Sequence, residues 1–122
     1  MSKFVIRTVS SGVKFDLRAA NGQSIATSEI YATVEACRNG IDSIRRNVPG
    51  ANVEDQTEEG FRKRKHPKFE IYADRAGQFR FRLKARNGEI IAVSQGYTTK
   101  ANCLNGIESV RRNAPDAEIV EE

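Results

Sequence analysis

The sequence is poor in the residues from which catalytic and metal sites are commonly built. It contains one histidine, His66, two cysteines, Cys37 and Cys103, and no tryptophan. These three ligands are too few for a structural zinc cage, and they show no recognised ligand spacing. The motifs GxGxxG, GxxxxGK[ST] and GxSxG are also absent. We therefore expect no catalytic residues, no bound metal and no cofactor, and we predict that the protein is not an enzyme.

Long apolar runs are missing as well. The N-terminus enters directly into an alternating pattern, and no segment is long and apolar enough to predict a signal peptide or a membrane span. Two cysteines in a chain without a secretion signal predict reduced thiols and a cytoplasmic location. Cys37 shares a predicted helix face with Ile41, and Cys103 with Ile107, which favours packing in the core over a Cys/His nucleophilic site.

What the chain does contain is an internal repeat. Residues Phe15–Val53 align with Phe81–Ile119 at a constant offset of 66, and 20 of the 39 aligned pairs are identical. A unit of about 50 residues buries too little surface to be comfortably stable alone, so we expect the two copies to share one core. We predict a single domain over residues 1–122, with repeat one at 3–54, a linker at 55–68 and repeat two at 69–122.

Within each copy, a hydrophobic period of two predicts three strands in a meander. In copy one, Phe4 and Ile6 mark the first strand, and Phe15 and Leu17 mark the second. Asn21-Gly22 in copy one and Asn87-Gly88 in copy two are expected to form two-residue hairpin turns with positive φ angles, each leading into a third strand.

A helix follows in each copy, and a short apolar stretch then predicts a closing strand. Thr33 and Thr99 are suited to cap the helix N-termini. Gly40 and Gly106 lie on the apolar helix face, where we expect close approach to the sheet. Each repeat is therefore predicted as beta-beta-beta-alpha-beta.

This order and the repeated residues "NG...IA.S..Y", "C.NGI.S" and "RRN.P.A" resemble the YegP-like family of small bacterial proteins, which have tandem repeats or form dimers of single repeats. The resemblance implies an α+β fold in which the repeats build one antiparallel sheet, exchange their last strands and place both helices on one face. It implies no activity and no catalytic residues, since the family is known mainly as proteins of unknown function.

Charge is distributed unevenly. Residues 61–86 carry a net charge of +8, whereas the rest of the chain carries −4. Strand alternation predicts that the cations of the second strand of copy two lie on the face opposite the core, with Tyr72 beside them. The copy-one equivalents are not all basic, so the fold does not require this row. The candidate residues for binding nucleic acid or another polyanion are Arg80, Arg82, Lys84, Arg86 and Tyr72, with Arg62, Lys63, Arg64 and Lys65 of the linker.

Two further interpretations remain open at this point. The basic row and the linker can be merely solvated, as charge runs in connectors usually are. Alternatively, the protein is a protein–protein interaction module without nucleic-acid binding, in which case Val5 and Val13 are expected to mark an apolar contact on the open side of the sheet. If the linker is ordered, Phe61 is its expected anchor.

Overall fold

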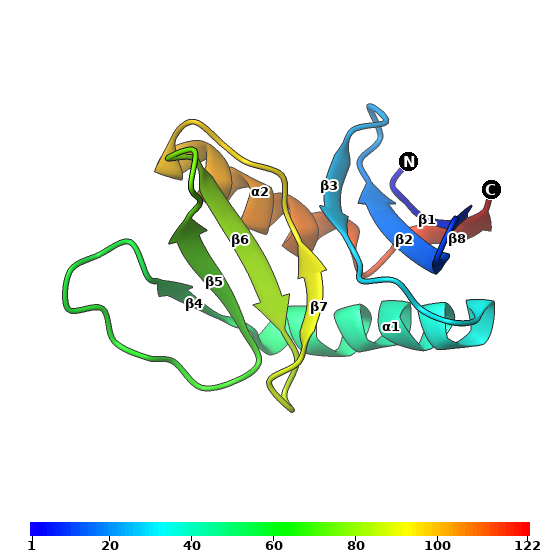
Figure 1. The fold of residues 1–122 in the computed structure, drawn as a ribbon, viewed down its shortest axis with the longest axis horizontal. Helices are drawn as coiled ribbons and strands as arrows, with labels where there is room; N and C mark the ends of the chain where they lie inside the picture. Colours follow the sequence, from blue (N-terminus) through cyan, green and yellow to red (C-terminus); the bar gives the residue numbers. More distant parts are fainter.

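The computed structural model describes all 122 residues as one eight-stranded sheet with two helices (Figure 1). The strand order in the sheet is β4-β5-β6-β7-β3-β2-β1-β8. The elements of repeat one are β1 (Lys3–Val9), β2 (Gly12–Arg18), β3 (Ser24–Thr27), α1 (Val34–Asn47), the short 3-10 helix η1 (Val48–Gly50) and β4 (Asn52–Asp55). The elements of repeat two are β5 (Lys68–Ala73), β6 (Phe79–Lys84), β7 (Ile90–Val93), α2 (Lys100–Asn113) and β8 (Glu118–Glu121). The predicted beta-beta-beta-alpha-beta order and the α+β class are confirmed.

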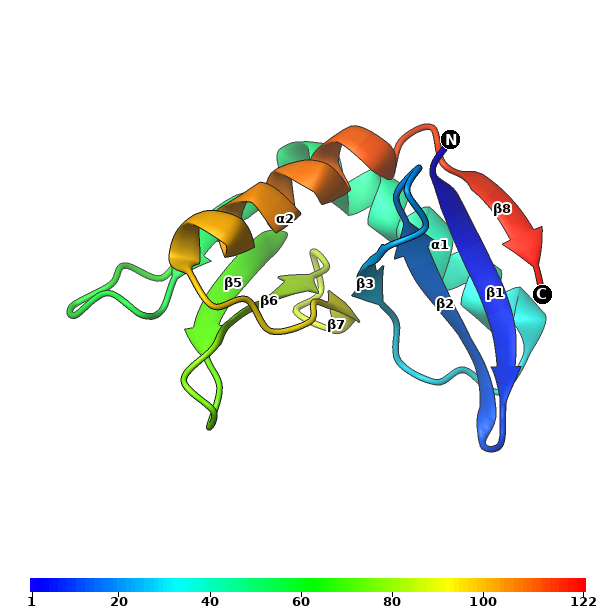
Figure 2. The ribbon, with the colours of Figure 1, turned by 90° about the horizontal axis from the view of Figure 1, so that it is seen from above.

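The two repeats exchange their closing strands. β4 of repeat one pairs with β5 of repeat two, and β8 of repeat two pairs with β1 of repeat one. Both of these pairings are parallel, so the sheet is antiparallel only in its six inner strands, in contrast to the expectation of a wholly antiparallel sheet. β4 is connected to β5 by the loop 56–67 and not by a tight hairpin turn, and a parallel pair needs a connection of about a dozen residues. The exchange places the first and last strands of the chain, β1 and β8, side by side at one edge of the sheet (Figure 2).

The turns at Asn21-Gly22 and Asn87-Gly88 differ from the predicted two-residue form. Only the glycines have positive φ, 85° and 86°, and both asparagines stay outside that region. The register shifts at Leu17/Arg18 and again at Leu83/Lys84. Each connection is therefore a longer loop with glycine at the left-handed position, next to an irregularity in the strand.

Both helices lie on one face of the sheet (Figure 2). The hydroxyl groups of Thr33 and Thr99 accept hydrogen bonds from the third residues of their helices, which confirms both predicted caps. α1 contacts β1 and β2 of its own repeat and β7 of the other, and α2 contacts β6 and β3. Neither helix is long and apolar enough to cross a membrane.

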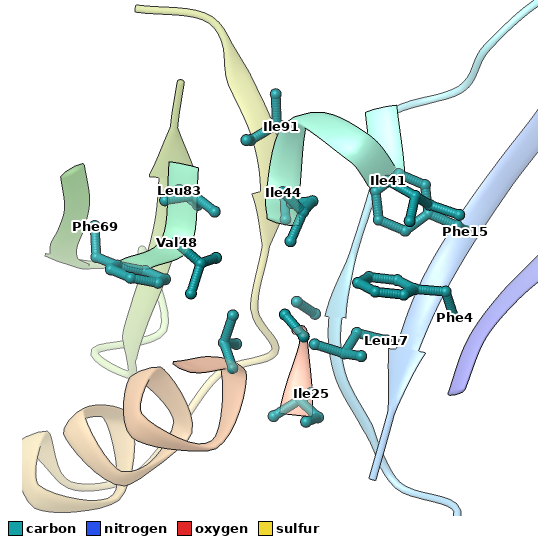
Figure 3. Close-up of a cluster of buried hydrophobic side chains, with 14 of the residues drawn as sticks. Phe4, Phe15, Leu17, Ile25, Ile41, Ile44, Val48, Phe69, Leu83 and Ile91 are labelled. Atoms are coloured by element: carbon teal, nitrogen blue, oxygen red, sulfur yellow. The ribbon is translucent and has the colours of Figure 1, made fainter. Parts of the chain in front are cut away.

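A single apolar core joins the two repeats. It contains 24 buried residues, among them Phe4 and Phe15 of repeat one and Phe69 and Leu83 of repeat two (Figure 3). Gly40 lets α1 approach the sheet, because a Cβ there would lie against the Tyr31 hydroxyl and 3.2 Å from Phe15 Cε2. The shared core confirms that the copies do not pack separately.

Candidate polyanion-binding surface

The basic row lies on the face of the sheet opposite the helices, with one exception. Arg80, Arg82 and Lys84 alternate along β6 with core residues such as Phe81. Arg86 does not belong to this row. β6 ends at Lys84, and the register shift at Leu83/Lys84 ends the regular alternation, so Arg86 lies in the following turn beside the C-terminal end of α1. The prediction that all four cations share one face is therefore wrong for Arg86.

Two carboxylates, Asp74 and Glu70, form ion pairs with the three cations that remain in the row. Arg80 Nε lies 2.7 Å from Asp74 Oδ2. Arg82 Nε lies 2.6 Å from Glu70 Oε1, and Lys84 Nζ lies 3.2 Å from the same oxygen. The Glu70 side chain is only 3% exposed, so its charge is taken up by these protein partners and not by water. The row therefore offers less positive potential than its composition indicates.

Strand exchange adds a second buried acid to this network. Lys68 on β5 bridges Glu54 of β4, at 2.8 Å, and Glu70, at 3.2 Å. Burial alone would raise the pKa of Glu54, but hydrogen bonds from Lys68, Gln56 and the Arg64 amide outweigh it and lower that pKa to about 2. Burial would likewise raise the pKa of Glu70, but hydrogen bonds from its cationic partners outweigh burial and lower this pKa. The network ties the exchanged strand β4 to repeat two.

Tyr72 lies beside the row, as expected, but one face of its ring is already occupied. The guanidinium carbon of Arg82 lies 4.5 Å from the centroid of the Tyr72 ring, in cation–π contact. Arg80 is the cross-strand partner of Tyr72. A nucleobase that stacked on this face of the ring would have to displace Arg82, which also holds Glu70.

The open face of repeat one also has a buried carboxylate that is paired with cations, but the acid and the cations occupy different positions from those in repeat two. Asp16 on β2 is paired with Arg7 at 2.8 Å and with Arg18 at 3.3 Å, and it accepts a hydrogen bond from Thr27 at 2.7 Å. Burial would raise the pKa of Asp16, but these partners lower it. In the aligned repeats Asp16 takes the place of Arg82. Each open face thus contains a buried carboxylate that forms ion pairs with more than one cation.

The linker cations have a different environment. The side chains of Arg62, Lys63, Arg64 and Lys65 are exposed, and none of them takes part in an ion pair. The backbone beneath them is held, because the Arg64 amide donates to Glu54 Oε1 at 2.6 Å and Asn52 Nδ2 donates to the Lys65 carbonyl at 2.9 Å. Figure 1 shows the segment as an extended loop that leaves the sheet between β4 and β5.

Phe61 begins this basic segment, and its side chain is 39% exposed. It is not a buried anchor, in contrast to the expectation, because hydrogen bonds to Glu54 and from Asn52 hold the loop instead. An exposed aromatic ring therefore precedes four exposed cations along the chain. The four linker cations are among the residues predicted from the sequence, but the sequence does not distinguish them from the paired cations of β6, because the pairing depends on which strands are neighbours.

Val5 and Val13 do not form the exposed apolar surface that was expected on the open side of the sheet. Val5 is 3% exposed and Val13 is 8% exposed, so neither can mark a docking surface. β8 covers the outer edge of β1 and places Val120 beside Val5. Val13 is covered by the segment at Tyr31, with which it exchanges two backbone hydrogen bonds.

The thiols are buried in the core. Cys37 and Cys103 are both fully buried, and burial raises the pKa of each, that of Cys103 to about 11. Both side chains are therefore protonated at neutral pH and are poor nucleophiles. No group of three or more His, Cys, Asp or Glu side chains is arranged to hold a metal ion.

Comparison with known proteins agrees with the repeat and the fold. The family model described as "Domain of unknown function (DUF1508)" matches residues 10–55 and 74–121. A "UPF0339 protein" of Pseudomonas aeruginosa is 34% identical over 122 residues, covering 99% of this chain and 97% of that protein. Another, from Treponema denticola, is 68% identical over 54 residues, which cover 44% of this chain and 93% of that protein.

A solved structure has the same architecture. The solution NMR structure of yegP from E. coli, described as a protein of unknown function, matches with a TM-score of 0.79 and 32% identity. The match covers 99% of this chain and 92% of that chain. The predicted resemblance is therefore confirmed, and none of these names describes an enzyme, a ligand or a partner.

Proposed function

Because the chain belongs to the family described as Domain of unknown function (DUF1508), whose name assigns no activity, we propose a function from the distribution of free charge. The protein is a non-enzymatic cytoplasmic module that binds single-stranded nucleic acid through the linker. One observation carries the proposal: the four consecutive linker cations, Arg62–Lys65, are exposed and unpaired, whereas the β6 cations are held by carboxylates.

Free cations are the groups that contribute to binding a phosphate backbone. A cation already paired with a buried carboxylate would have to give up that pair before it could contact a phosphate, and the buried acid would then be left uncompensated. Exposed linker cations lose only water and counterions. Their contact with phosphates releases counterions from the nucleic acid, which favours binding at low salt.

Phe61 supports a single-stranded ligand. An exposed aromatic side chain beside a basic track can stack on an unpaired base, and such stacking tolerates any sequence. In duplex DNA the bases are stacked on one another, so their faces are not available to an aromatic side chain. We therefore expect sequence-tolerant binding that is stronger for single strands than for duplexes of the same length.

Fluorescence anisotropy with labelled oligonucleotides of about 12 nucleotides tests the proposal. The linker variant replaces Arg62, Lys63, Arg64 and Lys65 by Gln. The control variant replaces four cations elsewhere that also lack ion pairs, namely Lys3, Lys14, Arg75 and Arg112, so both variants lose the same formal charge. Binding is expected to be lost in the linker variant and largely kept in the control. Equal weak binding by all three proteins would remove the proposal.

The same proteins separate nucleic-acid binding from a protein-interaction role. Affinity capture from a lysate is performed with and without nuclease. Partners that disappear with nuclease, and that the linker variant fails to capture, agree with the proposal. Protein partners that persist after nuclease and are captured equally by the linker variant contradict it.

A further inference from the structure

The C-terminal end of α1 lies beside the turn between β6 and β7 (Figure 1). A groove with mostly polar lining residues lies between these two segments. Its volume is about 540 Å³, within the range of small-molecule clefts. The lining residues are Ser43, Arg46, Asn47, Ala85, Arg86 and Asn87. The groove therefore joins the helix of repeat one to a turn of repeat two.

The groove contains two cations and no acid. Arg46 and Arg86 are both exposed, neither forms an ion pair, and no carboxylate lines the groove. Guanidinium groups present several N–H donors in a planar fork that matches phosphate oxygens. Two such groups lining one groove point to an anionic ligand with more than one oxygen.

Asn47 holds the two walls together. Its Nδ2 donates to the Ser43 carbonyl at 2.7 Å and to Ser43 Oγ at 3.1 Å, while its Oδ1 accepts from the Arg86 backbone amide at 3.2 Å. The start of the turn is thereby fixed to the last turn of α1. The positions of the two arginine backbones are set before any ligand arrives, which lowers the cost of ordering the site.

The negative end of the α1 macrodipole does not oppose an anion at full strength. Arg111 of α2 donates to the Val48 carbonyl at 3.1 Å and to the Ala51 carbonyl at 2.8 Å, just beyond the end of α1. Arg111 thus places a positive charge near the negative end of α1, which partly offsets the repulsion of an anion by the helix dipole.

In the other half of the molecule, the corresponding position lies between the end of α2 and the turn between β2 and β3. This position lacks the second cation. Asn113 makes the same two hydrogen bonds to Ser109 at the end of α2. Arg112 corresponds to Arg46, but Ala20 stands where repeat two has Arg86. The asparagine bridge within the helix is therefore a property of the fold, whereas the arginine pair is specific to one groove.

We propose that the groove between α1 and the β6–β7 turn binds a phosphate group between Arg46 and Arg86. This inference goes beyond the proposed function, because it uses neither the linker cations nor Phe61. The ligand class is a phosphoryl group with free oxygens. Inorganic phosphate, a nucleotide and the terminal phosphate of a strand all present this chemistry.

Amide chemical-shift titration of the 15N-labelled full chain with inorganic phosphate and with pyrophosphate, at constant ionic strength, tests the site. Saturable shifts are expected at Arg86 and Asn87. Arg46→Ala and Arg86→Ala should each weaken binding by roughly tenfold or more, as expected for loss of a charged hydrogen-bonding partner. Arg112→Ala, which removes the corresponding cation of the other half, should leave the affinity unchanged. The amide spectrum of each variant without ligand reports whether it is folded.

Shifts that rise linearly without saturation, or an affinity that Arg86→Ala leaves unchanged, would overturn the site. Titration with a 5′-phosphorylated dinucleotide and its dephosphorylated form distinguishes a nucleotide or strand terminus from free phosphate. The linker variant should keep saturable pyrophosphate binding. If that variant loses it, the groove is not an independent site; if oligonucleotide binding fails in the wild type but pyrophosphate saturates, only the proposed function fails.

Discussion

The cations of β6 and those of the linker are close in sequence but differ in what surrounds them. Arg82 and Lys84 both contact Glu70, a carboxylate with almost no access to water. The linker cations Arg62–Lys65 face solvent and have no carboxylate partner. A local net charge counts both groups equally. The β6 group therefore contributes to folding, whereas the linker group is free to contribute to binding.

The largest expected effect comes from breaking the buried network at its shared cation. Lys68→Met leaves the nearly fully buried Glu54 without its closest positive partner. Removing one member of a buried pair costs about 3–5 kcal/mol of unfolding free energy. Urea denaturation followed by circular dichroism measures the loss. Lys3, which begins β1 as Lys68 begins β5, is exposed and unpaired, so Lys3→Met should change stability by less than about 0.5 kcal/mol. Similar losses in both variants would contradict the network's role.

Acid should weaken the same edge of the sheet. The pKa of Glu54 is about 2 in the folded protein, against an ordinary value of 4.5. Because the folded pKa is lowered, its contribution to stability is present above about pH 4.5 and is lost as the pH falls towards 2. Urea midpoints measured across this range should fall less steeply in Glu54→Gln than in wild type. Parallel curves for the two proteins would show that Glu54 is not the group concerned.

A smaller effect is expected at the contact between helix and sheet. Gly40→Ala would press a methyl group against the Tyr31 ring, 2.8 Å from Cζ, and we expect a net loss of about 1 kcal/mol after the gain in helix propensity. Thermal unfolding should report a fall of roughly 4 °C. Gly50→Ala is the control, because nothing lies within 4 Å of its Cβ position. Adding Tyr31→Phe to Gly40→Ala removes the clashing hydroxyl and should restore part of the loss.

Much of the fold could be predicted because local signals agree with the final structure. The duplicated pattern predicted the repeated order of elements, Thr33 and Thr99 predicted the helix starts, and the small size of each repeat predicted a shared core. The parallel pairings of β4 with β5 and of β8 with β1 could not be predicted, because each closing strand has only four residues. Arg86 was misplaced because alternation was extended through an irregularity that the strand pattern does not reveal.

The candidate site was only partly predictable for a related reason. Glu70 has the same strand parity as Tyr72, so its position beside the basic row could have been inferred from the sequence. The contact of Lys68 with Glu54 depends on strand exchange between the repeats, and no local pattern indicates it. Which cations of a surface row are paired therefore depends on the tertiary structure. This pairing determines which cations are free to bind a ligand.

The salt dependence of single-strand binding tests this division of roles most directly. Each phosphate contact contributes about 0.7 to the slope of log K against log salt for a single strand. Replacing the four linker cations by Gln should lower the slope by up to about 3, whereas Arg82→Gln should leave it unchanged. An unchanged slope in the linker variant, or a reduced slope in Arg82→Gln with the fold intact, would contradict the account.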